Sequence, residues 1–144
     1  MTVAGILKHK GDHIISVRPT DSIGRVATVL TERRIGAVLV RDAADQLLGI
    51  VSERDIVHAL AAHGTRTLDM TAGQLMTRVL HTVSPHTTVA EAMSLMTEQR
   101  IRHVPVLEDG HLVGLVSIGD IVKARVMQQE CEVDSLKAYV AGAA

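Results

Sequence analysis

The sequence predicts an α+β fold built from two pseudo-symmetric repeats, each with the element order β-α-β-β-α. The first observation is an internal offset of 66 positions, which aligns residues 17–19 with 83–85 and residues 31–35 with 97–101. The second is an amphipathic helix pattern at the same place in each copy. The third is a pair of short apolar strand patterns that follows each helix. Together these patterns indicate one architectural unit that occurs twice.

Each copy begins with a short extended segment and a helix. The extended segments end in Val-x-Pro, and residues 20–22 in one copy and 87–88 in the other supply helix N-caps. The helices then space their apolar residues at i, i+3, i+4 and i+7, which is the pattern of one buried face. These residues are Ile23, Val26, Ala27 and Leu30 in the first copy and Val89, Ala92, Met93 and Met96 in the second.

Two strands and a second helix complete each copy. The polar turns between the strands predict two hairpins, 37–41 with 47–52 and 103–107 with 111–117. A short leading helix is expected before each copy, with Ile6 and Leu7 serving the first copy and Leu75 and Met76 the second. A linker is expected at 61–72.

These elements set the domain boundaries at 5–63 for repeat one, 72–127 for repeat two and 128–144 for a helical tail. A unit of about 60 residues is marginally stable alone, so we expect the two copies to pack through their sheets. The tail could pack on its own domain or form a dimer contact, and the sequence leaves both open. A helical period of apolar residues extends the last helix into this tail, at Val122, Val126, Val133, Leu136 and Val140.

Composition argues against several classes of protein. Tyr139 is the single aromatic residue of the 144, so no aromatic platform exists for stacking bases, and a net charge of −1 gives no basic stripe. We therefore expect no nucleic-acid partner. With Cys131 as the only cysteine, neither an intramolecular disulfide nor a thiolate zinc site can form, which suits a reducing cytoplasm. No apolar run reaches the ~20 residues of a membrane helix, so we expect no membrane partner.

The most distinctive shared motif is Gly-x-Val-Ser-x-x-Asp, at 49–55 and again at 114–120. A serine followed three residues later by an acid resembles a capping box, so Ser52 and Ser117 are expected to cap the helices that follow. A helix N-terminus also attracts anions, and a carboxylate there can accept both hydroxyls of a ribose. The motif therefore indicates a nucleotide as well as a cap.

Two copies that each end in this motif, together with Arg102 to Val106, resemble a tandem cystathionine β-synthase (CBS) domain pair over about residues 5–127. The resemblance implies clefts between the two repeats that bind adenosyl ligands such as AMP, ADP, ATP, NAD(H) or S-adenosylmethionine as regulatory ligands. It also implies a homodimer. Carried onto this chain, the ribose ligands would be Asp55 and Asp120, supported by Ser52 and Ser117.

The remaining candidate residues fall into two groups. The base pocket would be lined by Ser16, Val17, Ala37, Val38, Ile50, Thr82, Val83, Val104, Pro105 and Leu115. Phosphate charge would be neutralised by Arg34, Arg54, Arg100, Arg102, His103 and Lys123. The copies place their basic residues differently, so two equal sites are not guaranteed.

Three functions remain in competition. An enzyme is disfavoured because the eight histidines show no HExxH pattern, neither serine lies in a G-x-S-x-G elbow, and Cys131 lies in an acidic stretch. No catalytic residue, no metal site and no obligatory cofactor are therefore predicted. The main hypothesis is a regulatory, cytoplasmic sensor of adenosyl ligands that reports to a separate, unidentified protein. The alternative is a dimerising scaffold whose nucleotide sites are vestigial.

Overall fold

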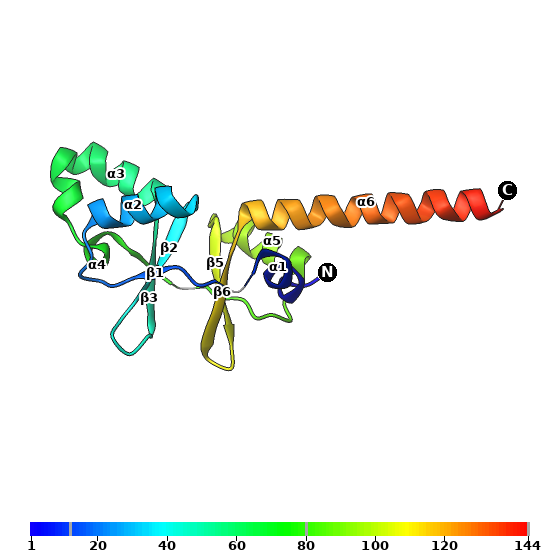
Figure 1. Cartoon of the computed structure of the whole chain (residues 1–144), viewed down its shortest axis with the longest axis horizontal. Coiled ribbons are helices and arrows are strands. Elements are labelled where there is room, and N and C mark those ends of the chain that lie inside the picture. The colour runs from blue at the N-terminus through cyan, green and yellow to red at the C-terminus, as the bar shows by residue number, and fades with distance from the viewer. Residues whose placement is uncertain (12, 80, 144) are drawn as a thin grey trace. The chain divides into compact units, whose positions relative to one another are not determined.

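The structure, a computed structural model, describes residues 1–11, 13–79 and 81–143. It divides into two compact units, the first made of residues 13–80 and the second of residues 1–12 with 81–144 (Figure 1). The expected boundaries 5–63, 72–127 and 128–144 include residues 12, 80 and 144, which lie outside the described residues.

The first unit contains a four-stranded sheet with the order β1-β2-β3-β4. The strands are β1 (Ser16–Val17), β2 (Ala37–Arg41), β3 (Leu47–Ser52) and β4 (Thr77–Arg78), and β1 runs parallel to β2 while the other pairs are antiparallel. Helices α2 (Ile23–Arg33) and α3 (Glu53–His63) lie on the same side of these strands in Figure 1. This order of elements confirms the predicted β-α-β-β-α repeat.

Alternation along the strands decides which side chains meet the helices. Val38 pairs with Val51 across the β2–β3 ladder, and both are fully buried in one cluster with the apolar face of α2. Because neighbouring side chains on a strand point to opposite faces, Ala37, Leu39 and Ile50 lie on the other face of the sheet. The apolar face of α2 holds Ile23, Val26 and Leu30, as the helical spacing predicts.

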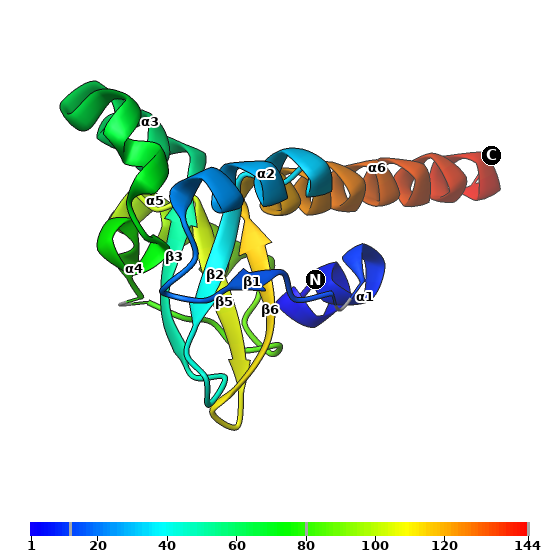
Figure 2. The same ribbon diagram turned by 60° about the vertical axis from the view of Figure 1, so that its left-hand side comes forward.

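The second unit repeats this arrangement with fewer paired strands. Its long hairpin joins β5 (His103–Glu108) to β6 (His111–Ser117), and a single parallel bridge from Val83 to Val106 takes the place of a first strand (Figure 2). Helix α5 (Val89–Gln99) and helix α6 (Ile118–Ala143) follow their strands as α2 and α3 do. The core of the unit is one apolar cluster that includes Val104, Val116 and Ile121.

The leading helices are exchanged relative to the prediction. Helix α1 (Val3–Lys10) belongs to the second unit, and helix α4 (Ala72–Leu75) belongs to the first. The prediction that each leading helix serves the copy that follows it is therefore wrong. The linker expected at 61–72 is also mostly helical, because it contains the end of α3, the 3-10 helix η1 (Gly64–Asp69) and the start of α4.

Equivalent backbone hydrogen bonds hold the exchanged helices. Val3 donates to Thr87 at 2.8 Å in the second unit as Ala72 donates to Asp21 at 2.8 Å in the first. The next residue of each helix also donates to the carbonyl of a proline, Pro85 in one unit and Pro19 in the other. The sequence of such a short helix does not indicate which sheet the helix will cover. Each helix is therefore assigned to its unit by these backbone hydrogen bonds and not by its hydrophobic pattern.

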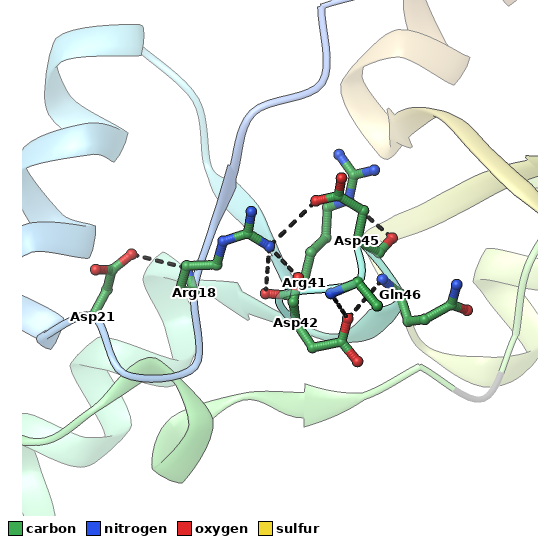
Figure 3. A network of polar contacts seen from close by, with 7 residues as sticks. Arg18, Asp21, Arg41, Asp42, Asp45 and Gln46 are labelled. Atoms are coloured by element: carbon green, nitrogen blue, oxygen red, sulfur yellow. Dashed lines mark hydrogen bonds and ion pairs between the residues drawn. The ribbon is translucent and has the colours of Figure 1, made fainter.

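A polar network fixes the tip of the β2–β3 hairpin in the first unit (Figure 3). The Arg18 guanidinium donates to the carbonyls of Arg41 and Asp42 and forms an ion pair with Asp45 at 3.3 Å. Within the turn, Oδ1 of Asp42 accepts backbone N–H groups from Ala44 and Gln46, each at 2.9 Å. The second repeat has Ser84 at the position of Arg18, so this clamp is a property of the first repeat.

Candidate functional site

In the first unit, Ser52 and Asp55 form the capping box that the motif predicts. The Ser52 hydroxyl accepts the backbone N–H of Asp55 at 3.2 Å, and Oδ2 of Asp55 accepts the backbone N–H of Ser52 at 2.9 Å. The Ser52 hydroxyl also donates to the same oxygen at 3.0 Å. These bonds fix the carboxylate at the N-terminus of α3, where the helix dipole favours negative charge.

Strand β4 brings a further group to this carboxylate. Thr77 pairs with Ile50 across the β3–β4 ladder, and its hydroxyl donates to Oδ1 of Asp55 at 3.4 Å. No lysine or arginine within the described part of the chain lies at ion-pair distance from Asp55. Among the described residues, the Asp55 carboxylate is therefore in contact with a weakly bound hydroxyl from β4 and not with a lysine or arginine.

The glycine of the motif makes room for this neighbouring segment. A Cβ at Gly49 would lie 2.7 Å from the Thr77 carbonyl oxygen and 2.9 Å from the Met76 sulfur. Both distances are shorter than real carbon contacts, so a larger residue at 49 would push the segment away. Gly49 thus permits the close approach that places Thr77 beside Asp55.

The second unit repeats the serine and aspartate geometry. The Ser117 hydroxyl accepts the backbone N–H of Asp120 at 3.1 Å, and Oδ2 of Asp120 accepts the backbone N–H of Ser117 at 2.9 Å. Here too the motif glycine faces the exchanged helix, because a Cβ at Gly114 would lie 2.6 Å from a methyl carbon of Leu7. The two ends of the repeats are built alike around a carboxylate at a helix N-terminus.

A lysine distinguishes the second carboxylate from the first. The ammonium of Lys10, at the end of α1, donates to Oδ2 of Asp120 at 2.8 Å and to the carbonyl of Leu115 at 2.8 Å. The Lys10 side chain is 41% exposed and that of Asp120 is 22% exposed. In the second unit, a cation from the exchanged helix thus neutralises the predicted ribose ligand.

The pKa of Asp120 reflects this environment. Burial raises the pKa of this carboxyl, but the hydrogen bond from Lys10, the backbone N–H of Ser117 and the charge of Lys10 lower it by more in sum. The net pKa lies below the usual value of an aspartate. Asp120 is therefore ionised and paired at neutral pH.

The residues expected to line the base pocket divide between the two faces of the strands. In the first unit, Val17 and Val38 point into the core cluster, while Ala37 and Ile50 lie on the opposite face. In the second unit, the face opposite the core carries Pro105 and Leu115, which pair with each other. Ser16 is half-buried and Thr82 exposed, and Val83 and Val104 belong to the second core cluster.

The expected phosphate ligands lie at helix and strand ends. Arg34 and Arg100 end α2 and α5 in the left-handed conformation, and Arg34 lines a groove of about 450 Å³ with Glu53 and Val57 from α3. This groove lies in the helical layer of the first unit. Arg54 and Lys123 are exposed on α3 and α6, Arg102 is exposed, and His103 is half-buried at the start of β5.

Sequence reasoning missed Lys10 and Thr77. Both lie in the exchanged segments, outside the repeated motif, and no spacing rule connects Lys10 to a carboxylate 110 positions away. The signal that was available is a lysine or threonine just after a short apolar helix, which is too common to single out a site. Within the described residues, no group of three histidine, cysteine, aspartate or glutamate side chains could hold a metal ion. None of the described helices combines the length and apolar character that spanning a membrane requires.

Three comparisons with known proteins all identify CBS domains. A family model described as CBS domain matches residues 9–62 and again residues 72–127. The CBS domain-containing protein CBSX3, mitochondrial, of Arabidopsis thaliana is 35% identical over 149 residues, covering 98% of this chain and 72% of the plant protein. The crystal structure of the CBS-domain containing protein ATU1752 from Agrobacterium tumefaciens is 43% identical with a TM-score of 0.83, covering 86% of this chain and 92% of that one.

Two further solved structures contain adenosyl ligands. The CBS domain protein PAE2072 from Pyrobaculum aerophilum is complexed with AMP. It is 31% identical with a TM-score of 0.74, covering 83% of this chain and 89% of that one. The CBS domain pair of protein MJ0100 is in complex with 5′-methylthioadenosine and S-adenosyl-L-methionine. It is 28% identical with a TM-score of 0.76, covering 86% of this chain and 98% of that one.

Proposed function

Because this chain belongs to the CBS-domain family as a tandem pair, we propose that it is a non-catalytic sensor of an adenosyl ligand such as AMP, ADP, ATP or NAD(H). The observation that carries the proposal is the carboxylate that each repeat holds at a helix N-terminus, Asp55 in one and Asp120 in the other. A carboxylate in that position accepts ribose hydroxyls, and the adjacent helix end favours the negative charge of a phosphate.

The solved relatives support an adenosyl ligand in particular. AMP, 5′-methylthioadenosine and S-adenosylmethionine, the ligands of the two related structures, share adenine and ribose but differ in charge. Apolar side chains can enclose adenine without aromatic stacking. In this chain Ala37, Ile50, Pro105 and Leu115 lie on the strand face opposite the core, beside the serine and aspartate of their repeat.

The two ribose positions are expected to differ in affinity. At Asp55 a ribose hydroxyl competes with two uncharged hydroxyl donors, Ser52 at 3.0 Å and Thr77 at 3.4 Å. At Asp120 it competes with an ammonium that holds the carboxylate at 2.8 Å. Since an ammonium holds a carboxylate more strongly than a hydroxyl does, the ligand should bind first at Asp55.

The test is a thermal-shift panel with AMP, ADP, ATP, NAD⁺, NADH and S-adenosylmethionine, with GTP as the control. A ligand at 100 times its dissociation constant stabilises a protein by about 2.7 kcal/mol, which raises Tm by roughly 5 to 10 °C in a chain of this size. We expect Asp55→Asn to abolish the shift for the best ligand, and Asp120→Asn to reduce it less. The asparagine keeps an oxygen for the Ser52 or Ser117 N–H, so each helix cap is retained.

Glu53→Gln is the matched control, because Glu53 is an exposed acid in the same first turn of α3 and has no part in the proposed contact. It should leave the thermal shift unchanged. A cooperative melt with no shift for any adenosyl ligand would refute the sensor. It would instead favour the alternative function, a dimerising scaffold with vestigial sites.

The sensor also needs an output. The proposal includes a homodimer and a separate regulated protein, since a ligand acts only by shifting an equilibrium between states that bind it differently. Cytoplasmic location remains a prediction from the single cysteine, and the plant relative carries a mitochondrial name.

A further inference from the structure

Helix α6 continues far beyond the core of its unit (Figure 1). Near its start, Ile121 and Ala124 are buried in the core cluster. From residue 129 to residue 142 every residue is exposed. The sequence left open whether this tail packs on its own domain, and the exposure of these residues contradicts that alternative.

Helix α6 carries an apolar stripe that is exposed at every residue. The stripe residues are Val122, Val126, Val133, Leu136 and Val140, with exposed fractions of 53%, 47%, 50%, 63% and 60%. Val126, Val133 and Val140 follow one another at intervals of seven residues. Val122, Gln129 and Leu136 do the same, and each lies four residues before a member of the first series. This is the a and d pattern of a two-stranded coiled coil.

A lone helix of this kind is unstable in water. Most helical stability in proteins comes from packing of an apolar face, and isolated helices shorter than about 12 to 15 residues are marginal. The fully exposed segment, residues 129–142, is about four turns long and leaves Val133, Leu136 and Val140 in water. A partner that covers the stripe would therefore stabilise the helix.

The charges beside the stripe match those of an identical helix. The flanking g positions hold Arg125 and Glu132, and the e positions hold Glu130 and Lys137. In a parallel pair each g residue faces the e residue five positions later on the partner. Arg125 then faces Glu130 and Glu132 faces Lys137, so both contacts join opposite charges.

An antiparallel pair that covers the whole stripe would instead join like charges. There e faces e and g faces g, which sets Glu130 against Glu130, Glu132 against Glu132 and Lys123 against Lys137. Gln129, the one polar seam position between Val122 and Val140, also meets its own copy only in the parallel, in-register arrangement. Paired polar groups at one seam position are known to specify register.

We propose that α6 docks a second copy of this chain as a parallel, in-register coiled coil along Val122 to Val140. The inference rests on α6 alone and does not depend on nucleotide binding. The mass of a dimer would not test it, because the proposed homodimer could form elsewhere and leave α6 unpaired.

Disulfide cross-linking of the full chain tests the arrangement. In a Cys131→Ser background, Gln129→Cys and Leu136→Cys each place one thiol in the seam. Both variants should form a disulfide-linked dimer on mild oxidation, because a parallel pair sets every seam position opposite itself. In an antiparallel pair a residue faces its own copy only at the midpoint of the pair. Residues 129 and 136 are about 10 Å apart along the helix, so at most one of the two variants could then cross-link. Ser135→Cys is the matched control, because it points away from the seam and should not cross-link.

A charge swap gives an independent readout. Glu132→Lys sets two lysines face to face and should abolish the cross-link at 129, and adding Lys137→Glu should restore it. Cross-linking at only one seam position, or at neither, would overturn the proposal. A cross-link that Glu132→Lys leaves unchanged would also count against it.

Discussion

The ion pair between Lys10 and Asp120 makes a sharp prediction about stability and pH. Lys10→Met removes the ammonium and keeps the aliphatic stem. The pair is short, at 2.8 Å, but its side chains are 41% and 22% exposed, so solvent screens much of the attraction. Exposed pairs contribute about 0.2 to 1 kcal/mol, and the added hydrogen bond to Leu115 places this pair at the upper end. We expect Lys10→Met to lose about 1 kcal/mol at pH 7, a fall in Tm of roughly 2 to 4 °C.

The loss should depend on pH in a defined direction. The pKa of Asp120 is lower in the folded chain than in the unfolded chain, so the pair contributes fully above the unfolded pKa near 4. Its contribution disappears as the pH falls through the folded pKa, because the carboxyl is then protonated in both states. The Tm difference between wild type and variant should therefore be constant from pH 7 to about pH 5 and shrink below pH 4 to the part that the Lys10–Leu115 hydrogen bond contributes.

The assay is thermal unfolding followed by circular dichroism at 222 nm, with NMR titration of the Asp120 carboxyl. Lys8→Met is the matched control, because Lys8 is an exposed lysine on the same helix. It should leave Tm nearly unchanged, whereas Lys10→Met should raise the pKa of Asp120. An equal Tm loss at pH 3 and pH 7, or an equal loss in both variants, would refute the reasoning.

Two further predictions concern the motif glycines of both units and the hairpin clamp of the first unit. Gly49→Ala should cost about 2 kcal/mol and Gly114→Ala about 1 kcal/mol or less, because the first new methyl meets a backbone oxygen and the second a movable Leu7 methyl. Urea unfolding measures both, and the reverse order would contradict the packing argument. Arg18→Ser, which copies the residue of the second repeat, should cost about 0.5 to 1 kcal/mol through loss of the hairpin clamp. The exposed Arg25→Ser is its control, and equal effects of the two changes would show that the clamp adds nothing.

The sequence alone was sufficient to predict the repeats, their hairpins and the helices that flank each hairpin. The two hairpins lie where alternation and turn residues placed them, and the apolar faces of α2 and α5 contain the residues that helical spacing selected. The caps at Ser52 and Ser117 were also predictable. These features depend on interactions between residues a few positions apart, which a local pattern records directly.

The candidate site was predictable in part. The motif identified Asp55 and Asp120 because it occurs twice, and the structure places both at helix N-termini. Period-two alternation could have separated Ile50, on the face opposite the core cluster, from Val38, in the core cluster, once the strand register was known. The choice of residues for the base pocket needed that register, which the pattern alone does not supply.

Only the tertiary structure decided which unit each leading helix joins and what lies beside each carboxylate. Helices α1 and α4 are short and have few apolar residues, so either sheet could bury them, and the choice depends on backbone contacts between distant segments. That choice brings Lys10 to Asp120 and Thr77 to Asp55, and it makes two nearly identical motifs electrostatically different. The physical reason is that charge pairing acts through space, whereas a sequence pattern records only neighbours along the chain.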